Sequence, residues 1–287
     1  MIFEVFAYSL IFLALIVGSY SDFKIREVAD WISYGLVFAG LGLRIIFSLI
    51  TSNPWFIYEG LIGFTVLLAF ALIMFYTGQW GGGDSKILIA MGAVIGIKLT
   101  TTTFLIGFFI NLVIFGAIYG FGYSLYLVYK HKDRFKEAFI QIIKDQKIEQ
   151  IIFGGVALLV GITAFLVPKE YLIGLIGISI LIITSYFAIA YLKAVELSAM
   201  IKEVSPEKLT EGDWIVDDVI VNKKIICGPK DLGIEQHQID TLIALKKKKK
   251  INLITIKEGI PFIPSFLLAF ISTYFWGNWL FIYLQIL

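Results

Sequence analysis

The sequence predicts an all-α polytopic membrane protein with six to eight transmembrane helices and a small cytoplasmic α+β insert. First, 59% of the 287 residues are hydrophobic and only 16% are charged, with a mean hydropathy of +0.87. Soluble domains average about 45–50% apolar and about 25% charged residues. Second, apolar runs of about 20 residues, enough to cross a bilayer, recur along the chain. Third, one segment near the C-terminal end is strongly polar.

The apolar runs predict eight candidate spans. The first run lacks the basic start of a secretory signal and ends in a poor cleavage site, so we expect it to be retained as a helix. The fourth run is short, and the fifth is long and rich in glycine, so these two are the least regular. The eight runs are 2–20, 31–50, 55–77, 85–98, 101–129, 150–167, 171–192 and 261–286.

The charge of the connecting segments predicts the orientation of the spans. Six Lys and Arg residues lie in 130–150 and twelve lie in 193–260, whereas the connections on the opposite side hold only two. Because cytoplasmic loops are enriched in Lys and Arg, both basic segments are expected in the cytoplasm. Eight spans then put both termini outside and bring the loops 21–30 and 78–84 to the cytoplasmic face.

The polar segment divides the chain into three parts. Residues 1–192 hold the transmembrane helices, 193–258 form the soluble insert, and 259–287 form the final helix. The apolar stretch 150–192 is a candidate inserted hairpin. Residues 196–258 carry eleven acidic and eleven basic side chains. Residue types typical of strands and turns predict strands at 213–221, 225–227 and 251–256 and a turn at 222–224. Helical spacing of apolar residues predicts a helix at 234–245.

Residues 130–150 have the pattern of an amphipathic helix. Their apolar side chains recur at spacings of three and four residues, which is typical of a helix that lies on a membrane surface. The apolar stripe consists of Phe135, Phe139, Ile142 and Ile143.

Two aspartates lie at span ends on the same predicted face. Asp22 follows the first apolar run, and Asp84 opens the fourth run directly after Gly81-Gly82-Gly83. Each has an ordinary interpretation as a helix-end charge, and Asp84 and Asp30 both fit the N-cap position of the helix that follows. Ionisable residues at the membrane are nevertheless candidates for function.

A pair of carboxylates held close together shares one proton. One member can then deprotonate a water molecule while the other protonates a carbonyl oxygen, which hydrolyses a peptide bond. We expect no metal or cofactor, because Cys227 is the only cysteine and the two histidines, His131 and His237, are far apart. A net charge of only +2 argues against a broad nucleic-acid-binding face.

These residues resemble a known group of enzymes. Gly81-Gly82-Gly83-Asp84 matches the GxGD motif of the GxGD membrane aspartic proteases. The stretch from Asp22 to Trp31 resembles the first-aspartate region of the type IV prepilin peptidase family, and looks closest to its archaeal branch, the preflagellin (archaellin) peptidases. Pro261 to Leu267 resembles the proline-containing segment before the last helix of that family. The resemblance covers about 1–125 and 255–287.

The resemblance implies an aspartic endopeptidase in the cell membrane. Such an enzyme removes the short basic class III signal peptide from preflagellin or prepilin precursors at the cytoplasmic face. Asp22 and Asp84 carry over as the catalytic aspartates, and Gly81 and Gly83 as the residues that shape the turn around Asp84. Bacterial members often carry zinc-binding cysteine pairs and N-methylate the new terminus. This sequence has no such pairs, so we expect no methyltransferase activity.

Three alternatives remain open from the sequence. The same aspartates fit an ion-coupled transporter or channel, although both lie at span ends and no internal repeat is visible. The polar insert fits an assembly scaffold that recruits a partner. Within the family, the substrate is either preflagellin or prepilin.

Overall fold

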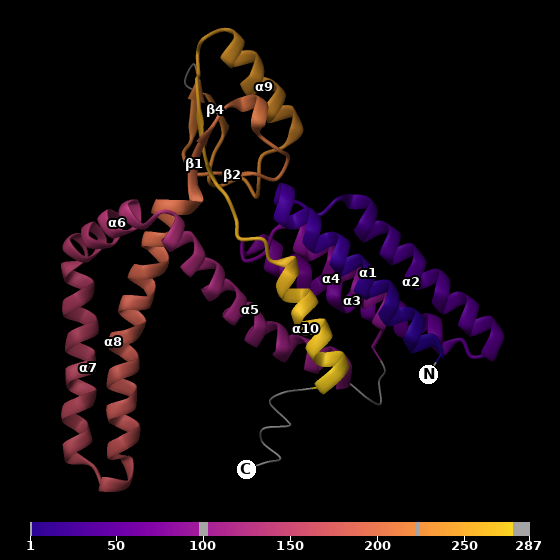
Figure 1. The fold of residues 1–287 in the computed structure, drawn as a ribbon, viewed down its shortest axis with the longest axis horizontal. Coiled ribbons are helices and arrows are strands. Elements are labelled where there is room, and N and C mark those ends of the chain that lie inside the picture. The colour runs from indigo at the N-terminus through magenta and orange to yellow at the C-terminus, as the bar shows by residue number, and fades with distance from the viewer. Residues whose placement is uncertain (1, 98–102, 222–223, 278–287) are drawn as a thin grey trace. The chain divides into compact units, whose positions relative to one another are not determined.

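The computed structural model describes residues 2–97, 103–221 and 224–277 (Figure 1). It confirms the predicted fold class, a polytopic helical membrane protein with a small strand-containing region. Among the described residues, six helices are long and apolar enough to cross a membrane. They are α1 (Ile2–Ile25), α2 (Asp30–Thr51), α3 (Trp55–Tyr76), α5 (Thr103–Lys130), α7 (Lys147–Leu166) and α8 (Leu172–Val195).

Two of the eight predicted spans correspond to helices of only 14 described residues, which are not among these six. The predicted span 85–98 is α4 (Gly82–Ile95), which has 14 residues. At 1.5 Å per residue it is about 21 Å long, less than the roughly 30 Å of a hydrocarbon core. The predicted span 261–286 contains α10 (Ile263–Trp276). The end of the predicted span 85–98, the start of the predicted span 101–129 and the end of the last span lie outside the described residues.

The chain divides into two compact units. The first consists of Met1–Tyr123, Ser205–Ile254 and Glu258–Leu287, and the second of Ser124–Val204 and Thr255–Lys257.

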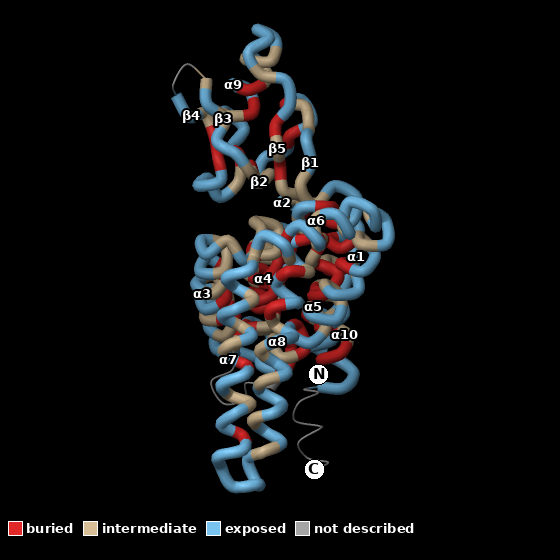
Figure 2. Tube along the Cα trace, turned by 90° about the vertical axis from the view of Figure 1, so that its left-hand side faces the viewer, coloured by how far each residue is buried: buried red, intermediate tan, exposed pale blue. Residues whose placement is uncertain are grey.

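Helix α4 lies at the centre of the first unit's helical bundle. It packs against α1, α2 and α3, and α10 packs against α1 (Figure 1). Buried residues concentrate in these helices (Figure 2). More than half of the 14 residues of α4 are buried, because other helices surround α4 on nearly every side. The buried residues are Ser85, Ile87, Leu88, Ala90, Met91, Gly92, Ala93 and Val94.

Glycines allow α3 and α4 to approach closely. A Cβ on Gly63 would lie 2.3 Å from the carbonyl oxygen of Gly92, and a Cβ on Gly92 would lie 2.5 Å from the carbonyl oxygen of Gly63. Real Cβ atoms do not approach oxygen so closely, so neither position accepts a side chain without a shift. Small residues at such a crossing are a common way to bring membrane helices together, since lipid offers no hydrophobic drive for association.

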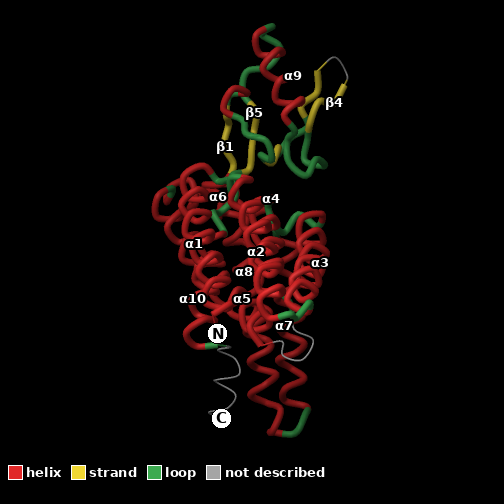
Figure 3. Tube along the Cα trace, turned by 90° about the vertical axis from the view of Figure 1, so that its right-hand side faces the viewer, coloured by secondary structure: helices red, strands yellow, loops and turns green. Residues whose placement is uncertain are grey.

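The strands lie between residues 201 and 257 (Figure 3). The three-stranded sheet has the order β1-β5-β2, and β3 pairs with β4 in antiparallel register, with an irregularity between Val219 and Ile220. Helix α9 (Gln236–Lys247) confirms the predicted helix. The bounds of the strands are Ile201–Val204 for β1, Trp214–Ile215 for β2, Val219–Val221 for β3, Lys224–Cys227 for β4 and Ile254–Lys257 for β5.

The prediction of one continuous strand over 213–221 was wrong. The strand is interrupted between β2 and β3, where Asp217 and Asp218 stand. Aspartate is depleted in strands, because its short polar side chain competes for the backbone hydrogen bonds of the ladder. Two residues of the predicted turn, 222–223, lie outside the described residues.

The second unit contains an amphipathic helix and a long hairpin. Helix α6 (Lys132–Asp145) confirms the predicted helix, and its apolar stripe packs on Ala190 and Ala194 of α8. That stripe is therefore covered at least partly by protein. Helices α7 and α8 pack on each other and are largely exposed along their apolar length (Figure 2), as expected of helices whose solvent is lipid.

The α3–α4 crossing gives a testable prediction. Gly92→Ala should destabilise the protein by about 1–3 kcal/mol, because the added methyl group overpacks against the backbone of Gly63. Thermal unfolding in detergent measures this. Gly120→Ala is the matched control, because a Cβ there meets nothing within 4 Å. Equal melting temperatures for the two variants would contradict the close approach.

Candidate active site

Helical periodicity places Asp22 on the buried face of α1. Predicted as part of a loop, Asp22 instead lies in the last turn, because α1 continues to Ile25. The buried residues of α1 recur at helical spacing, and Asp22 continues their series. Only 7% of Asp22 is exposed. The series is Ala7, Ile11, Leu15, Gly18 and Asp22.

Asp22 binds the start of α10. Its Oδ2 accepts a hydrogen bond from the backbone N–H of Ile263 at 3.0 Å. Pro264 stands in the first turn of α10, where a missing N–H costs nothing, because the first N–H groups of a helix have no partner within it. A carboxylate at this end also interacts favourably with the helix dipole. The proline-containing segment is thus connected directly to the first aspartate.

Asp84 lies in the first turn of α4, on the helix that forms the centre of the bundle. The helix begins at Gly82, so Asp84 is its third residue, and the prediction that Asp84 is the N-cap was wrong. Its Oδ2 accepts a hydrogen bond from the backbone N–H of Gly81 at 3.3 Å. The residue as a whole is partly exposed, and the bond from Gly81 holds the carboxylate at the helix start.

The structure brings Asp22 and Asp84 into one site. Their carboxylates lie close enough to interact electrostatically. Val28, in the connection between α1 and α2, packs between the two helix ends. A Cβ on Gly83 would lie 3.1 Å from Val28 Cγ2, and a Cβ on Gly18 would lie 3.9 Å from Val28 Cγ1. Gly83 therefore leaves the space that Val28 fills beside Asp84.

Aromatic side chains pack around Trp80, the residue before Gly81. The Trp80 ring packs edge-on against Phe266 with centroids 5.5 Å apart, and against Phe70 at 5.7 Å. Trp80 and Phe262 are 6.2 Å apart. The residues next to both aspartates, Gly81 and Ile263, are thus flanked by one aromatic cluster from α3, α10 and the loop before α4.

The interpretation of Asp30 as an N-cap was wrong. Ala29 occupies that position and no side-chain cap is formed. Asp30 instead forms an ion pair with Lys86 of α4, two residues after Asp84. This exposed pair links the starts of α2 and α4, and exposed pairs contribute little to stability.

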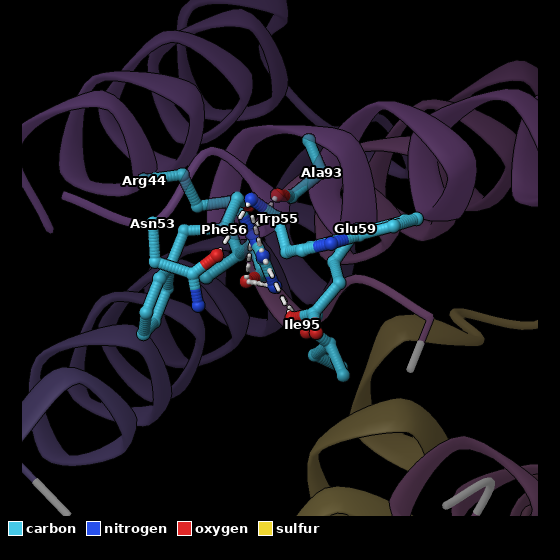
Figure 4. Close-up of polar contacts among 8 residues, drawn as sticks. Arg44, Asn53, Trp55, Phe56, Glu59, Ala93 and Ile95 are labelled. Carbon is cyan, nitrogen blue, oxygen red and sulfur yellow. Dashed lines mark hydrogen bonds and ion pairs between the residues drawn. The ribbon is translucent and has the colours of Figure 1, made fainter. Parts of the chain in front are cut away.

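Arg44 is a buried cation that the sequence reasoning missed. It lies in the middle of α2 with no exposed surface. Its guanidinium donates to the carbonyl oxygens of Ala93 at 3.0 Å and of Val94 at 3.0 and 3.1 Å, and it also donates to Ile95 O (Figure 4). These carbonyls end α4, where no further turn can bind them. The single charge within the predicted span 31–50 was a signal from which the sequence could have identified it.

Arg44 also connects α4 to the start of α3. Its Nη1 donates to the carbonyl oxygen of Phe56 at 2.6 Å and lies 3.6 Å from Glu59 Oε2 (Figure 4). A Cβ on Gly60 would lie 2.3 Å from Arg44 Cδ, and a Cβ on Gly96 would clash with the guanidinium. The two glycines therefore leave the space that the Arg44 side chain fills, and backbone carbonyl oxygens accept its hydrogen bonds.

Other reactive side chains do not converge. Over the described ranges 2–97, 103–221 and 224–277, no group of three or more His, Cys, Asp or Glu side chains is arranged to hold a metal ion. Cys227 is buried at the end of β4, and burial raises the pKa of its thiol to about 11. A protonated thiol is a poor nucleophile, so the paired aspartates are the strongest candidate for chemistry.

The fold and this site define a helical membrane protein with two carboxylates on adjacent helix ends. Residues 9–129 match the sequence model of the type IV leader peptidase family. This match covers α1 to α5 and includes both aspartates.

Three curated preflagellin peptidases are similar to part of the chain. The Methanococcus voltae protein is 37% identical over 89 residues, which are 31% of this chain and 38% of that protein. The Methanocaldococcus jannaschii protein is 31% identical over 83 residues, 29% of this chain and 35% of that protein. The Methanococcus maripaludis protein is 34% identical over 83 residues, 29% and 36% of the two chains. The matches thus span little more than a third of these relatives. No solved structure matches the chain.

The Arg44 cluster gives a second prediction. Arg44→Met leaves the carbonyl oxygens at the end of α4 and the Glu59 carboxylate without their partner, so we expect a loss of several kcal/mol. The stability of Arg44→Lys should fall between that of the wild type and that of Arg44→Met, because an ammonium cannot donate to several carbonyl oxygens in the planar geometry of a guanidinium. Thermal unfolding in detergent checks the order. Lys169→Met, at an exposed position, is the control. A melting temperature for Arg44→Met equal to that of the control would show that the cluster is dispensable.

Proposed function

We propose that the chain is a member of the type IV leader peptidase family and acts as a membrane aspartic endopeptidase. Its substrates are preflagellin or prepilin precursors, from which it removes the short basic class III signal peptide. Asp22 and Asp84 are the catalytic residues. The observation that carries the proposal is the approach of these two carboxylates, which are 62 positions apart in the sequence (84 − 22).

The surroundings assign different roles to the two carboxylates. Asp22 accepts the Ile263 N–H at the positive end of α10 and lies within electrostatic range of Arg26. Both contacts favour the ionised form. Among the described residues, Asp84 accepts only the longer hydrogen bond from Gly81. Asp22 is therefore the general base, and Asp84 holds the proton that the pair shares.

The reaction follows from these roles. Asp22 takes a proton from a water molecule as the water oxygen bonds to the scissile carbonyl carbon, and Asp84 gives its proton to the carbonyl oxygen. The tetrahedral intermediate then collapses. The C–N bond breaks, the leaving nitrogen takes the proton from Asp22, and the carbonyl oxygen returns its proton to Asp84. Both carboxyls end in their starting states, so the cycle uses no covalent intermediate.

The glycines before Asp84 favour an extended substrate. Gly81 and Gly83 shape the turn without side chains that obstruct a main chain. We place this site at the cytoplasmic face of the cell membrane, because the Lys-rich and Arg-rich segments are expected there. Residues 1–192 and 259–287 then form the membrane part, with 193–258 as a cytoplasmic insert and 150–192 as an inserted hairpin. Lipid is the other partner.

Conservative substitution of either aspartate tests the function. Asp22→Asn and Asp84→Asn should reduce cleavage by at least about a thousandfold, because an amide can neither take nor give the proton. Both should remain folded, since an amide oxygen still accepts from Ile263 or Gly81. The assay incubates purified protein in detergent with preflagellin and prepilin leaders and follows leader release.

Asp30→Asn is the matched control. It removes a carboxylate from the same region, but that carboxylate is exposed and bound to Lys86, so cleavage should continue. Normal processing by either Asp22→Asn or Asp84→Asn would reject the aspartic mechanism. A faster rate with one leader decides between preflagellin and prepilin as the substrate.

A further inference from the structure

A tyrosine hydroxyl beside Asp22 has no partner in the structure. The Tyr119 side chain of α5 is partly buried, and its hydroxyl oxygen is shielded from water and has no hydrogen-bond partner among the described residues. A buried donor without a partner destabilises a fold, and such groups in a native structure call for an explanation.

Helical spacing directs Tyr119 toward the candidate active site. Phe108 and Leu112 of α5 belong to the buried core shared with α10. Asn111 Nδ2 donates to Thr273 Oγ1 of α10 at 2.9 Å. Further along α5, a Cβ on Gly116 would lie 3.3 Å from the Phe262 ring. Tyr119 follows one turn later on this same face, next to the residues that Asp22 binds.

The groups around Tyr119 form one electrostatic cluster. Tyr119 interacts with Asp22, Arg26 and Tyr123. Arg26 Nη2 donates to the Tyr123 hydroxyl at 2.6 Å, and the Tyr119 and Tyr123 rings lie 6.1 Å apart. Arg26 Nη1 is a second buried donor without a described partner. Two unused donors beside one carboxylate suit a ligand that offers hydrogen-bond acceptors, such as the carbonyl oxygens of a peptide main chain.

Resting on the proposed function, we propose that Tyr119 is a further catalytic residue, whose hydroxyl donates a hydrogen bond to the carbonyl oxygen of the scissile peptide bond. Arg26 Nη1 provides the second donor to the same peptide main chain. An extended peptide that enters beside Asp22 displaces the packing around the phenol, and its carbonyl supplies the acceptor that the fold lacks. The bond strengthens as negative charge develops on that oxygen, so it acts mainly on the transition state.

Tyr119→Phe tests this inference, because it removes the hydroxyl and keeps the ring. We expect kcat to fall about 10–100-fold with KM within about threefold, as for the loss of one donor to a developing oxyanion. The melting temperature in detergent should stay the same or rise, since the variant removes an unpaired buried hydroxyl. Tyr129→Phe, at an exposed position of the same helix, should match the wild type in both measurements.

Each outcome separates the inference from the proposed function. If wild-type protein cleaves a leader and Tyr119→Phe cleaves it within about twofold, the inference fails alone. A loss of kcat that comes with a lowered melting temperature also overturns it, because the hydroxyl would then be structural. A shifted pH profile with an unchanged maximal kcat would mean that Tyr119 acts only on Asp22. Absence of cleavage by wild-type protein rejects the proposed function, and the inference with it.

Discussion

The short helix α4 is the constraint on which the rest of the membrane bundle depends. With 14 residues it cannot cross a bilayer alone, so its last carbonyls end among the other helices. Unsatisfied carbonyls in an apolar medium cost several kcal/mol each, and only protein groups can satisfy them there. Arg44 does so, and the α3–α4 glycines allow the neighbours to close around it. Asp84 owes its position to this arrangement, because it lies at the other end of the same helix.

A second connection fixes the first aspartate. The Ile263 N–H donates to Asp22 across 241 positions of sequence, so the end of α1 and the start of α10 are held together. Val28 fills the space between the ends of α1 and α4. The two carboxylates thus come from helices that are each fixed by tertiary contacts, which is how preorganised catalytic groups are generally held.

The sequence predicted the main features of the fold because those features follow from local composition. Long apolar runs predicted the membrane helices, and helical spacing predicted α6 and α9. The predictions of a continuous strand over 213–221 and of Asp30 as an N-cap were wrong. In both places an aspartate side chain has a choice of partners, and the sequence does not show which partner it binds. Lys86, the partner of Asp30, lies 56 residues away in the sequence. Arg44 was overlooked although a lone charge in an apolar run is visible in the sequence.

The sequence by itself determined that the chain is a membrane protein, and it selected Asp22 and Asp84 as candidates together with Gly81 and Gly83. Hydropathy and motif spacing are one-dimensional properties, so they can be read directly from the residues. Only the tertiary structure decided that the two carboxylates share a site. It also decided that Asp22 accepts a hydrogen bond from the Ile263 N–H, and that Arg44 donates to the last carbonyl oxygens of α4. Each of these facts is a contact between distant segments, whose geometry is set by how whole helices pack and not by the residues beside them.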